Sequence, residues 1–265
     1  MAKLGFIGCG NMANAMMKGI IANRVAAPGD LRASDPSAET LARAEKALGI
    51  RASEGNRALV RECETVVLSV KPQFYAEVIG EIAPEVRPEQ LIITIAPGKT
   101  LEWLGKTFGK PVKIVRTMPN TPAMVGEGIT AVCPNELVAP DDLEKALRIL
   151  RGFGQAEVIP ERLMDAVVSV SGSSPAYVFL FIEAMADAAV ADGMPRAQAY
   201  RFAAQAVLGS AKMVLETGKH PGELKDMVCS PAGTTIEAVR VLEEKGFRSA
   251  VFEAMRACTR KAQSM

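Results

Sequence analysis

The sequence contains one histidine, and its five cysteines are widely scattered. The cysteines form no CxxC pair, so neither a disulfide framework nor a zinc site is supported, and we predict no bound metal. The single histidine, His220, precedes Pro221 and Gly222, a context typical of a loop or a helix cap. Catalysis by a serine, histidine and acid triad is therefore not indicated.

Neither sign of charge predominates, because 31 lysines and arginines stand against 30 aspartates and glutamates. Without a basic patch, nucleic-acid binding is not expected. Met1, Ala2 and Lys3 lead straight into apolar residues 4–7, which is too short for a secretory signal. The most apolar stretch, residues 176–191, carries Glu183 and Asp187 and is shorter than a membrane span, so a buried helix is expected. We expect a cytoplasmic protein with no membrane partner.

The first two thirds of the chain alternate short β-branched runs with helical patterns, as an α/β fold with a doubly wound parallel sheet requires. Several predicted strands are apolar on both faces, which fits a sheet covered by helices on each side. The predicted strands cover residues 4–7, 31–34, 65–70, 91–95, 112–116, 129–133 and 156–159. The predicted helices between them cover residues 12–23, 38–48, 74–82, 101–108 and 141–153.

After Pro160 the strand signals almost vanish, and helical patterns follow at residues 163–170, 176–191, 196–216, 235–244 and 247–263. We therefore predict two domains, residues 1–160 and an all-α domain of residues 161–265. The predicted helix at 176–191 is apolar on nearly every side, and a domain of this size has few layers with which to bury it. A second subunit would supply the cover, so we predict a homodimer through the helical domain.

Residues 8–13 read GCGNMA, a GxGxxA motif between an apolar strand ending at Ile7 and a helix. In that context Gly8 and Gly10 permit a tight turn and close backbone approach. The amide groups at the helix start, around Asn11 and Met12, attract a pyrophosphate. The motif predicts a Rossmann-type dinucleotide-binding domain, and a glycine turn without a ligand is the alternative.

Asp35 directly follows the second predicted strand, near the spacing at which an acid contacts an adenosine ribose. A carboxylate there accepts a hydrogen bond from the 2′-hydroxyl of NAD(H) but repels the 2′-phosphate of NADP(H). Ser34 and Ser37 suit a phosphate if the acid turns away. The alternative makes Asp35 a turn residue before Pro36. Asn56 is interpreted as a ribose contact or as a helix cap.

Two more turns follow predicted strands, one with Val70, Lys71 and Pro72 and one with Ala96 and Pro97. Ligands of such sheets bind beyond the carboxyl ends of the strands, so both turns are expected to line the cofactor. A merely solvated Lys71 is the alternative.

Asn120 lies in a proline-bounded loop after another predicted strand. Two interpretations stand: its side chain holds the nicotinamide amide, or the loop is simply rigid.

Residues 230–235 read SPAGTT and run into a predicted helix. Thr234 and Glu237 fit a capping box, which would place the turn at the positive end of that helix. Such a turn presents amide groups to a small anion such as a substrate carboxylate. A cap that only starts the helix is the alternative.

Six motifs in order resemble those of the pyrroline-5-carboxylate reductase family, over essentially the whole chain. They are IGCGNM (7–12), VKPQ (70–73), MPNTP (118–122), SGSSPAY (171–177), HPGELK (220–225) and SPAGTT (230–235). The resemblance implies reduction of L-1-pyrroline-5-carboxylate to L-proline, the last step of proline biosynthesis. The implied cofactor is NADP(H), with NAD(H) as the alternative.

The resemblance also implies site residues and an assembly. Ser230, Gly233, Thr234 and Thr235 would bind the substrate carboxylate, and Thr235 would act catalytically by hydrogen bonding to the ring nitrogen. Helical domains of the family interlock as dimers that often assemble into larger rings. The sequence departs from the family pattern where Ser174 and Ala232 each replace a usual glycine and so add a side chain where the backbone approaches its neighbours closely.

Two other functions remain open from the residues alone. One is a related imine or β-hydroxyacid dehydrogenase, against which the turn at residues 230–235 argues. The other is a non-catalytic nucleotide sensor, against which the motifs of the helical domain argue.

Overall fold

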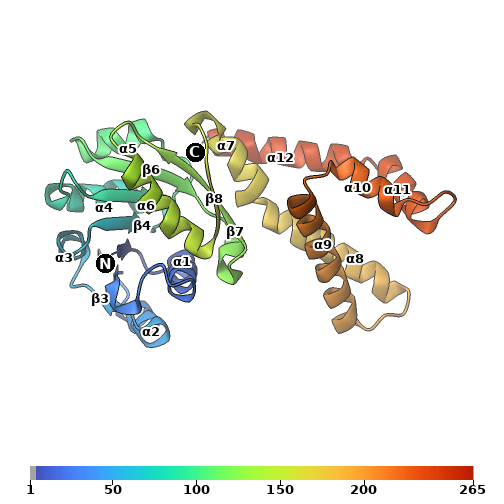
Figure 1. The fold of residues 1–265 in the computed structure, drawn as a ribbon, viewed down its shortest axis with the longest axis horizontal. Helices are drawn as coiled ribbons and strands as arrows, with labels where there is room; N and C mark the ends of the chain where they lie inside the picture. Colours follow the sequence, from blue (N-terminus) through green and yellow to red (C-terminus); the bar gives the residue numbers. More distant parts are fainter. Residues whose placement is uncertain (1–3, 265) are drawn as a thin grey trace. The chain divides into compact units, whose positions relative to one another are not determined.

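The computed structural model describes residues 4–264, so the predictions that involve Met1, Ala2 and Lys3 lie outside the described residues. The described chain divides into two compact units, residues 4–173 with 259–264 and the segment Ser174–Cys258. The order of elements confirms the predicted fold class: a parallel α/β region comes first, and helices follow it (Figure 1).

The first unit contains one eight-stranded sheet with the strand order β3-β2-β1-β4-β5-β6-β7-β8. The first six positions have the doubly wound order, in which the chain reverses direction across the sheet between β1 and β4. The strands are β1 (Leu4–Ile7), β2 (Leu31–Ser34), β3 (Arg51–Ala52), β4 (Thr65–Leu68), β5 (Leu91–Thr94), β6 (Lys113–Met118), β7 (Gly128–Pro134) and β8 (Gly154–Val158).

Two features of the sheet differ from the sequence-based expectation. The two-residue strand β3 was not predicted. Both of its residues are exposed at the edge of the sheet, so they form no apolar run. Strand β7 pairs antiparallel with β6, whereas every other pair in the sheet is parallel. The loop between β6 and β7 is too short for the crossover connection that a parallel pair needs. The chain therefore reverses direction, and β7 pairs antiparallel with β6.

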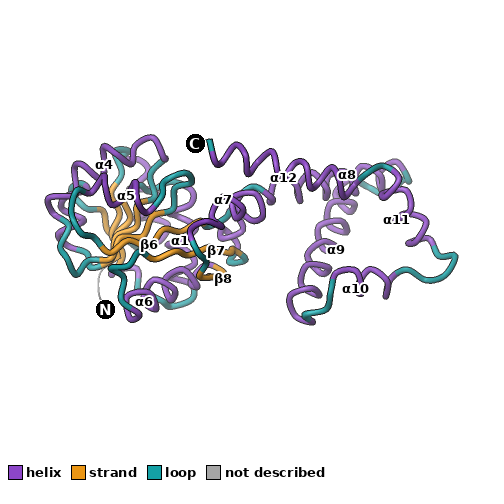
Figure 2. The backbone as a smooth tube through the Cα atoms, turned by 90° about the horizontal axis from the view of Figure 1, so that it is seen from above, coloured by secondary structure: helices purple, strands orange, loops and turns teal. Residues whose placement is uncertain are grey.

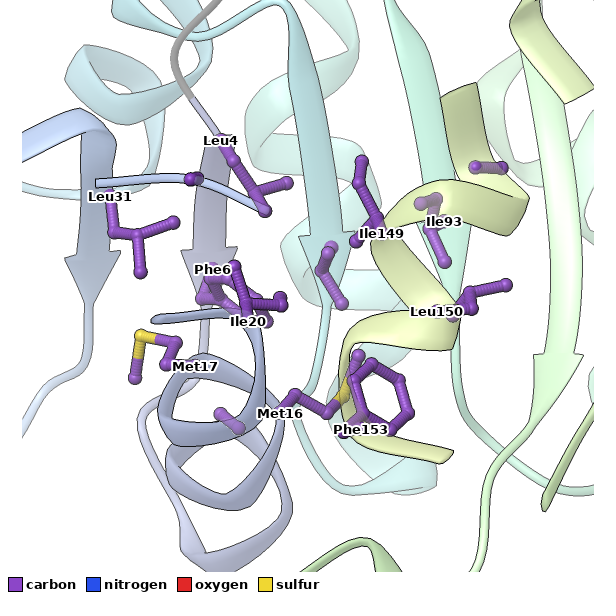
Figure 3. Close-up of a cluster of buried hydrophobic side chains, with 14 of the residues drawn as sticks. Leu4, Phe6, Met16, Met17, Ile20, Leu31, Ile93, Ile149, Leu150 and Phe153 are labelled. Carbon is purple, nitrogen blue, oxygen red and sulfur yellow. The ribbon is translucent and has the colours of Figure 1, made fainter. Parts of the chain in front are cut away.

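Helices cover both faces of the sheet, as the fully buried strands β1, β2, β4 and β5 require (Figure 2). One face packs against α1 (Asn11–Ala22), α2 (Ala38–Leu48) and α6 (Pro140–Leu150). Figure 3 shows this cluster, in which Phe6 of β1 lies among Met16, Met17 and Ile20 of α1. The other face packs against α3 (Asn56–Glu62), α4 (Tyr75–Ile82) and α5 (Leu101–Phe108).

The chain from residue 161 onward is almost entirely helical. A 3-10 turn (Glu161–Leu163), α7 (Met164–Val167) and a π-helical segment (Val168–Gly172) end the first part of unit 1. The remaining helices are α8 (Ser174–Ala191), α9 (Arg196–Thr217), α10 (Pro221–Val228), α11 (Thr234–Glu244) and α12 (Phe247–Gln263).

Helix α8 is apolar on nearly every side but is not buried within the chain. Ala186 is its only buried residue, whereas Phe179 and Leu180 are 62% and 68% exposed. The expectation of a buried helix is therefore wrong for the single chain. The helical segment Glu161–Ala191 is also long and apolar enough, by length and composition, to cross a membrane.

Candidate active site

The glycine-rich turn joins β1 to α1. Gly8 has a φ of +93°, and a Cβ on it would meet Ser69 O at 2.8 Å, so only glycine fits. Gly10 is the N-cap of α1, has a φ of −73°, and would have nothing within 4 Å of a Cβ. The fold itself thus has no need of glycine at position 10. The first turn of α1 has no side-chain cap and no acidic residue, which leaves its amide groups suited to a phosphate.

The Asp35 carboxylate braces this turn. Its Oδ2 accepts a hydrogen bond from Cys9 N–H at 2.8 Å, and its Oδ1 accepts one from Ser37 N–H at 2.9 Å. Burial and, to a lesser degree, the negative charge of Asp35 raise the pKa of the Cys9 thiol above its ordinary value. The thiol therefore stays protonated at neutral pH. These bonds agree with the interpretation of Asp35 as a turn residue. The side chain of Ser37 caps α2, where its Oγ accepts a hydrogen bond from Thr40 N–H.

Ser34 and Asn56 come together beside Asp35, as parts of a chain of hydrogen bonds. Ser34 Oγ donates to Asn56 Oδ1 at 2.7 Å, and Asn56 Nδ2 donates to Glu81 Oε2 at 2.6 Å. Asn56 is the first residue of α3, and the N-cap is Gly55, so Asn56 does not cap the helix. The sequence did not indicate Glu81, because within the pattern of α4 it resembles any solvent-facing carboxylate.

The turns after β4 and β5 lie at the same edge of the sheet as the glycine turn. Ser69 N–H donates to Ile7 O, and Ser69 Oγ lies 2.7 Å from Gly8 O, so the end of β4 is fixed to the glycine turn. Val70, Pro72 and Pro97 are half-buried, Ala96 is buried, and Lys71 is exposed. The predicted cofactor residues of β1, β4 and β5 therefore share the carboxyl edge of the sheet.

Asn120 is 8% exposed, and both ends of its side-chain amide are occupied. Its Oδ1 accepts a hydrogen bond from Ile129 N–H at 2.9 Å, and its Nδ2 donates to Ser171 O at 3.2 Å. The side chain thus connects the loop after β6 to β7 and to the π-helical segment. This arrangement supports the interpretation as a rigid loop.

Residues 230–233 form the turn between α10 and α11, and Thr234 and Thr235 begin α11. Gly233 N–H donates to Ser230 O at 3.1 Å, and Ala232 adopts a φ of +58°, in the left-handed region. The predicted capping box is wrong, because the N-cap of α11 is Gly233, which has no side chain to cap the helix. Glu237, the other member of that predicted box, pairs with Arg240 instead, at 2.7 Å. The amide groups at the start of α11 are therefore not engaged by a side-chain cap.

His220 and Asp187, two other titratable residues considered in the sequence, have structural partners. His220 caps α10, where its Nδ1 accepts a hydrogen bond from Gly222 N–H, which confirms the predicted helix cap. Asp187 of α8 pairs with Arg196 of α9. Among residues 4–264, no cluster of histidine, cysteine, aspartate or glutamate has the arrangement of a metal site.

A cavity of about 550 Å³ opens beside the glycine turn, between α1 and α2. Gly10 and Asn11 line it together with two cationic side chains, Lys18 and Arg43. Positive charge on this side of the turn favours an anionic ligand.

Known protein families match both parts of the chain. Residues 161–265 match the family model for pyrroline-5-carboxylate reductase dimerisation, and residues 3–98 match the model for NADP oxidoreductase, coenzyme F420-dependent. The chain is 55% identical to the pyrroline-5-carboxylate reductase of Escherichia coli (strain K12) over 99% of the chain and 98% of the relative. It is 46% identical to that of Methanosarcina acetivorans over 96% of the chain and 94% of the relative.

Two solved structures share the fold over nearly their full length. A pyrroline-5-carboxylate reductase from Coxiella burnetii superposes with a TM-score of 0.92 at 34% identity, covering 99% of this chain and 98% of the other. A Plasmodium falciparum pyrroline carboxylate reductase with NADP bound superposes with a TM-score of 0.89 at 33% identity, covering 99% and 97%.

The two glycines of the turn predict different consequences of an added methyl group. Gly10→Ala should lower the free energy of unfolding by at most about 1 kcal/mol, since its Cβ has open space and alanine is only a poorer N-cap than glycine, but should weaken NADPH binding about tenfold or more, because a pyrophosphate must approach there. Gly8→Ala should lower the free energy of unfolding by about 1–3 kcal/mol through backbone strain alone, and by more because its Cβ would lie 2.8 Å from Ser69 O. Urea unfolding and calorimetric titration with NADPH measure the two effects. Unchanged NADPH affinity in Gly10→Ala would contradict close approach at this position.

The left-handed conformation of Ala232 predicts that glycine is better tolerated there than alanine. Ala232→Gly should raise the free energy of unfolding by up to about 1 kcal/mol, because relief of strain exceeds the added entropy of the unfolded chain. The matched control is Ala42→Gly in the exposed middle of α2, which should lose about 1 kcal/mol. Equal losses for both variants in urea unfolding would show that Ala232 is not strained.

Proposed function

The chain belongs to the pyrroline-5-carboxylate reductase family, and from this premise we propose how its residues divide the reaction. The activity is reduction of the C=N bond of L-1-pyrroline-5-carboxylate to L-proline with NAD(P)H, the last step of proline biosynthesis. A hydride passes from the nicotinamide to the imine carbon while the protonated ring nitrogen takes up the electron pair of the C=N bond. The oxidised cofactor and the amine of proline result. Positioning supplies much of the catalysis in such a transfer.

The observation that carries the proposal is a helix start with uncapped amide groups and an open Gly10 at the carboxyl edge of a doubly wound sheet. We propose that the cofactor lies along this edge, with its pyrophosphate at α1. The proposed cofactor residues are Ile7, Gly8, Gly10, Asn11, Met12, Ser34, Asp35, Asn56, Val70, Lys71, Pro72, Ala96, Pro97 and Asn120.

Two of these residues act chiefly by holding others in place. Asp35 braces the glycine turn through Cys9 N–H, and its remaining lone pairs are proposed to meet the adenosine ribose. Asn120 holds the loop after β6, and only its second amide hydrogen is left for the nicotinamide. The chain carries an NADP-binding domain, and use of NADH as well is part of the proposal.

The substrate site is proposed at the turn before α11. Ser230, Gly233 and Thr234 would hold the substrate carboxylate, supported by the uncapped start of this helix and its positive dipole end. Thr235, half-buried in the first turn of α11, would hydrogen-bond to the ring nitrogen and is the proposed catalytic residue.

The helical region is a dimerisation domain, and its surface explains the need for a partner. The buried hydrophobic residues of Ser174–Cys258 are only Ala186, Ala199, Ala203 and Leu224. Phe202 and Leu215 of α9 are 68% and 84% exposed in the single chain. Large apolar side chains of an obligate interface have this exposure until the subunits assemble. The family match supports a partner subunit, and not a membrane, as the cover of α8.

The larger assembly, the domain boundary and the location are also proposed. A larger ring of dimers is proposed beyond the dimer. The domain boundary is proposed at residues 160 and 161, supported by the family match that begins at residue 161. A cytoplasmic location is proposed, supported by the thiols of Cys9, Cys133 and Cys229, which are not in disulfides.

Thr235→Ala tests the catalytic assignment. Loss of one hydrogen bond to a charged group, about 1.5–3 kcal/mol, should lower kcat/KM for pyrroline-5-carboxylate by about 10- to 150-fold and leave the KM for NADPH unchanged. A spectrophotometric assay with NADPH and with NADH measures both parameters.

Thr235→Ser, which keeps the hydroxyl, is the matched control and should recover most of the activity. Wild-type kinetics in Thr235→Ala would remove this residue from the site. Oxidation of NADPH with a keto acid, but not with pyrroline-5-carboxylate, would overturn the proposed function as a whole.

A further inference from the structure

Tyr75 is fully buried at the start of α4, where its ring packs in the cluster between α3, α4, α5 and the sheet. Its hydroxyl reaches the ends of two neighbouring strands. It donates to Leu68 O of β4 at 2.5 Å and accepts from Ile95 N–H, just beyond β5, at 3.2 Å. Burial raises the pKa of the phenol above its ordinary value, so the hydroxyl remains a donor at all physiological pH values.

The hydroxyl occupies a position where the ladder between β4 and β5 would otherwise continue. These strands are parallel, and Leu68 pairs with Thr94 in the last step of the register. At the other end of the ladder Leu91 N–H donates to Glu64 O. Hydrogen bonds of a parallel ladder recur at every second residue, so Ile95 N–H would be expected to donate to Leu68 O. Two hydrogen bonds through the Tyr75 oxygen replace this single one.

With the phenolic oxygen between them, Leu68 O and Ile95 N–H bond to Tyr75 and not to each other. Ser69 and Val70 follow Leu68 directly, and Ala96 follows Ile95. The turns that begin at these residues are those proposed to line the cofactor. In a doubly wound sheet the β4 and β5 side of the crevice receives the half of the dinucleotide opposite to the adenosine half at β2.

We propose that Tyr75 is a positioning residue that holds open the ends of β4 and β5 and thereby fixes the two turns that receive the nicotinamide half of the cofactor. The inference rests on the proposed cofactor site. Tyr75 is fully buried, so its proposed action runs through the backbone groups that its hydroxyl contacts, and not through direct contact with a ligand. Phe74, its neighbour, is 48% exposed and makes no comparable insertion.

Tyr75→Phe separates the hydroxyl from the ring, which stays the same size. Without the oxygen, Leu68 O and Ile95 N–H either pair directly or remain unpaired, and the two turns shift in both cases. The dissociation constant of NADPH should rise about tenfold, in line with the loss of one or two buried hydrogen bonds. The fragment 2′,5′-ADP, which lacks the nicotinamide half, should bind the variant as it binds the wild type.

Calorimetric titration of the dimeric enzyme with NADPH and with 2′,5′-ADP gives both constants. Tyr200→Phe, a change in an exposed tyrosine of α9, is the matched control and should leave both unchanged. Equal weakening of the two ligands in Tyr75→Phe would show a general structural role and overturn the proposal. So would unchanged affinity for NADPH.

A second variant keeps the test decisive if Tyr75→Phe does not fold. Incorporation of 4-aminophenylalanine at position 75 restores the donor to Leu68 O but supplies only a weak acceptor for Ile95 N–H, so it should weaken NADPH binding by about three- to tenfold and leave 2′,5′-ADP binding unchanged. Equal weakening of both ligands, or wild-type affinity for NADPH, would contradict the role of the inserted oxygen. Failure of the wild type to bind either NADPH or 2′,5′-ADP would instead refute the proposed cofactor site.

Discussion

The site depends on one constraint: the backbone groups at the end of the parallel ladder must find hydrogen-bond partners. Where β1, β4 and β5 stop pairing, their last amide and carbonyl groups lose strand partners while still largely buried, and unpaired groups there would cost about 1–3 kcal/mol each. Side chains from neighbouring segments satisfy them. Asp35 accepts from Cys9 N–H, Ser69 contacts Gly8 O, and Tyr75 bridges Leu68 and Ile95. The turns beyond the strands are thus fixed before any ligand arrives, which is the preorganisation that positioning catalysis needs.

The helical domain follows a different principle. Its residues form long helices with well-paired backbones, but between Ser174 and Cys258 the chain buries little of its apolar surface. Hydrophobic burial is the dominant favourable contribution to folding, so this region obtains much of its stability from the second subunit. The apolar circumference of α8 is therefore a feature of the assembly and not of the isolated chain.

Sequence periodicity predicted the large elements well, because buried strands and helices carry apolar patterns of their own. The strands Leu4–Ile7 and Leu31–Ser34 and the helix Ala38–Leu48 have the predicted bounds. Strand β3 was not predictable, since two exposed residues carry no pattern. The direction of β7 depends on which segments pair with each other, and sequence periodicity does not report that pairing.

The site was predictable where chemistry follows from position in the chain, and less so where it follows from contacts. The glycine turn is recognisable from GxGxxA, but the bond from Cys9 to Asp35 spans 26 residues and appears only in three dimensions. For the same reason Glu81 and Tyr75 were not singled out. The capping box failed because Gly233, one residue earlier than Thr234, takes the N-cap position.

Hydrogen–deuterium exchange with and without NADPH tests the central claim most directly, since it reports protection along the whole backbone. The account predicts slower exchange on NADPH binding in four segments, residues 8–13, 34–37, 69–73 and 95–98, all at the carboxyl edge of the sheet. Protection confined to the opposite edge, around residues 25–28 and 64–65, would contradict it.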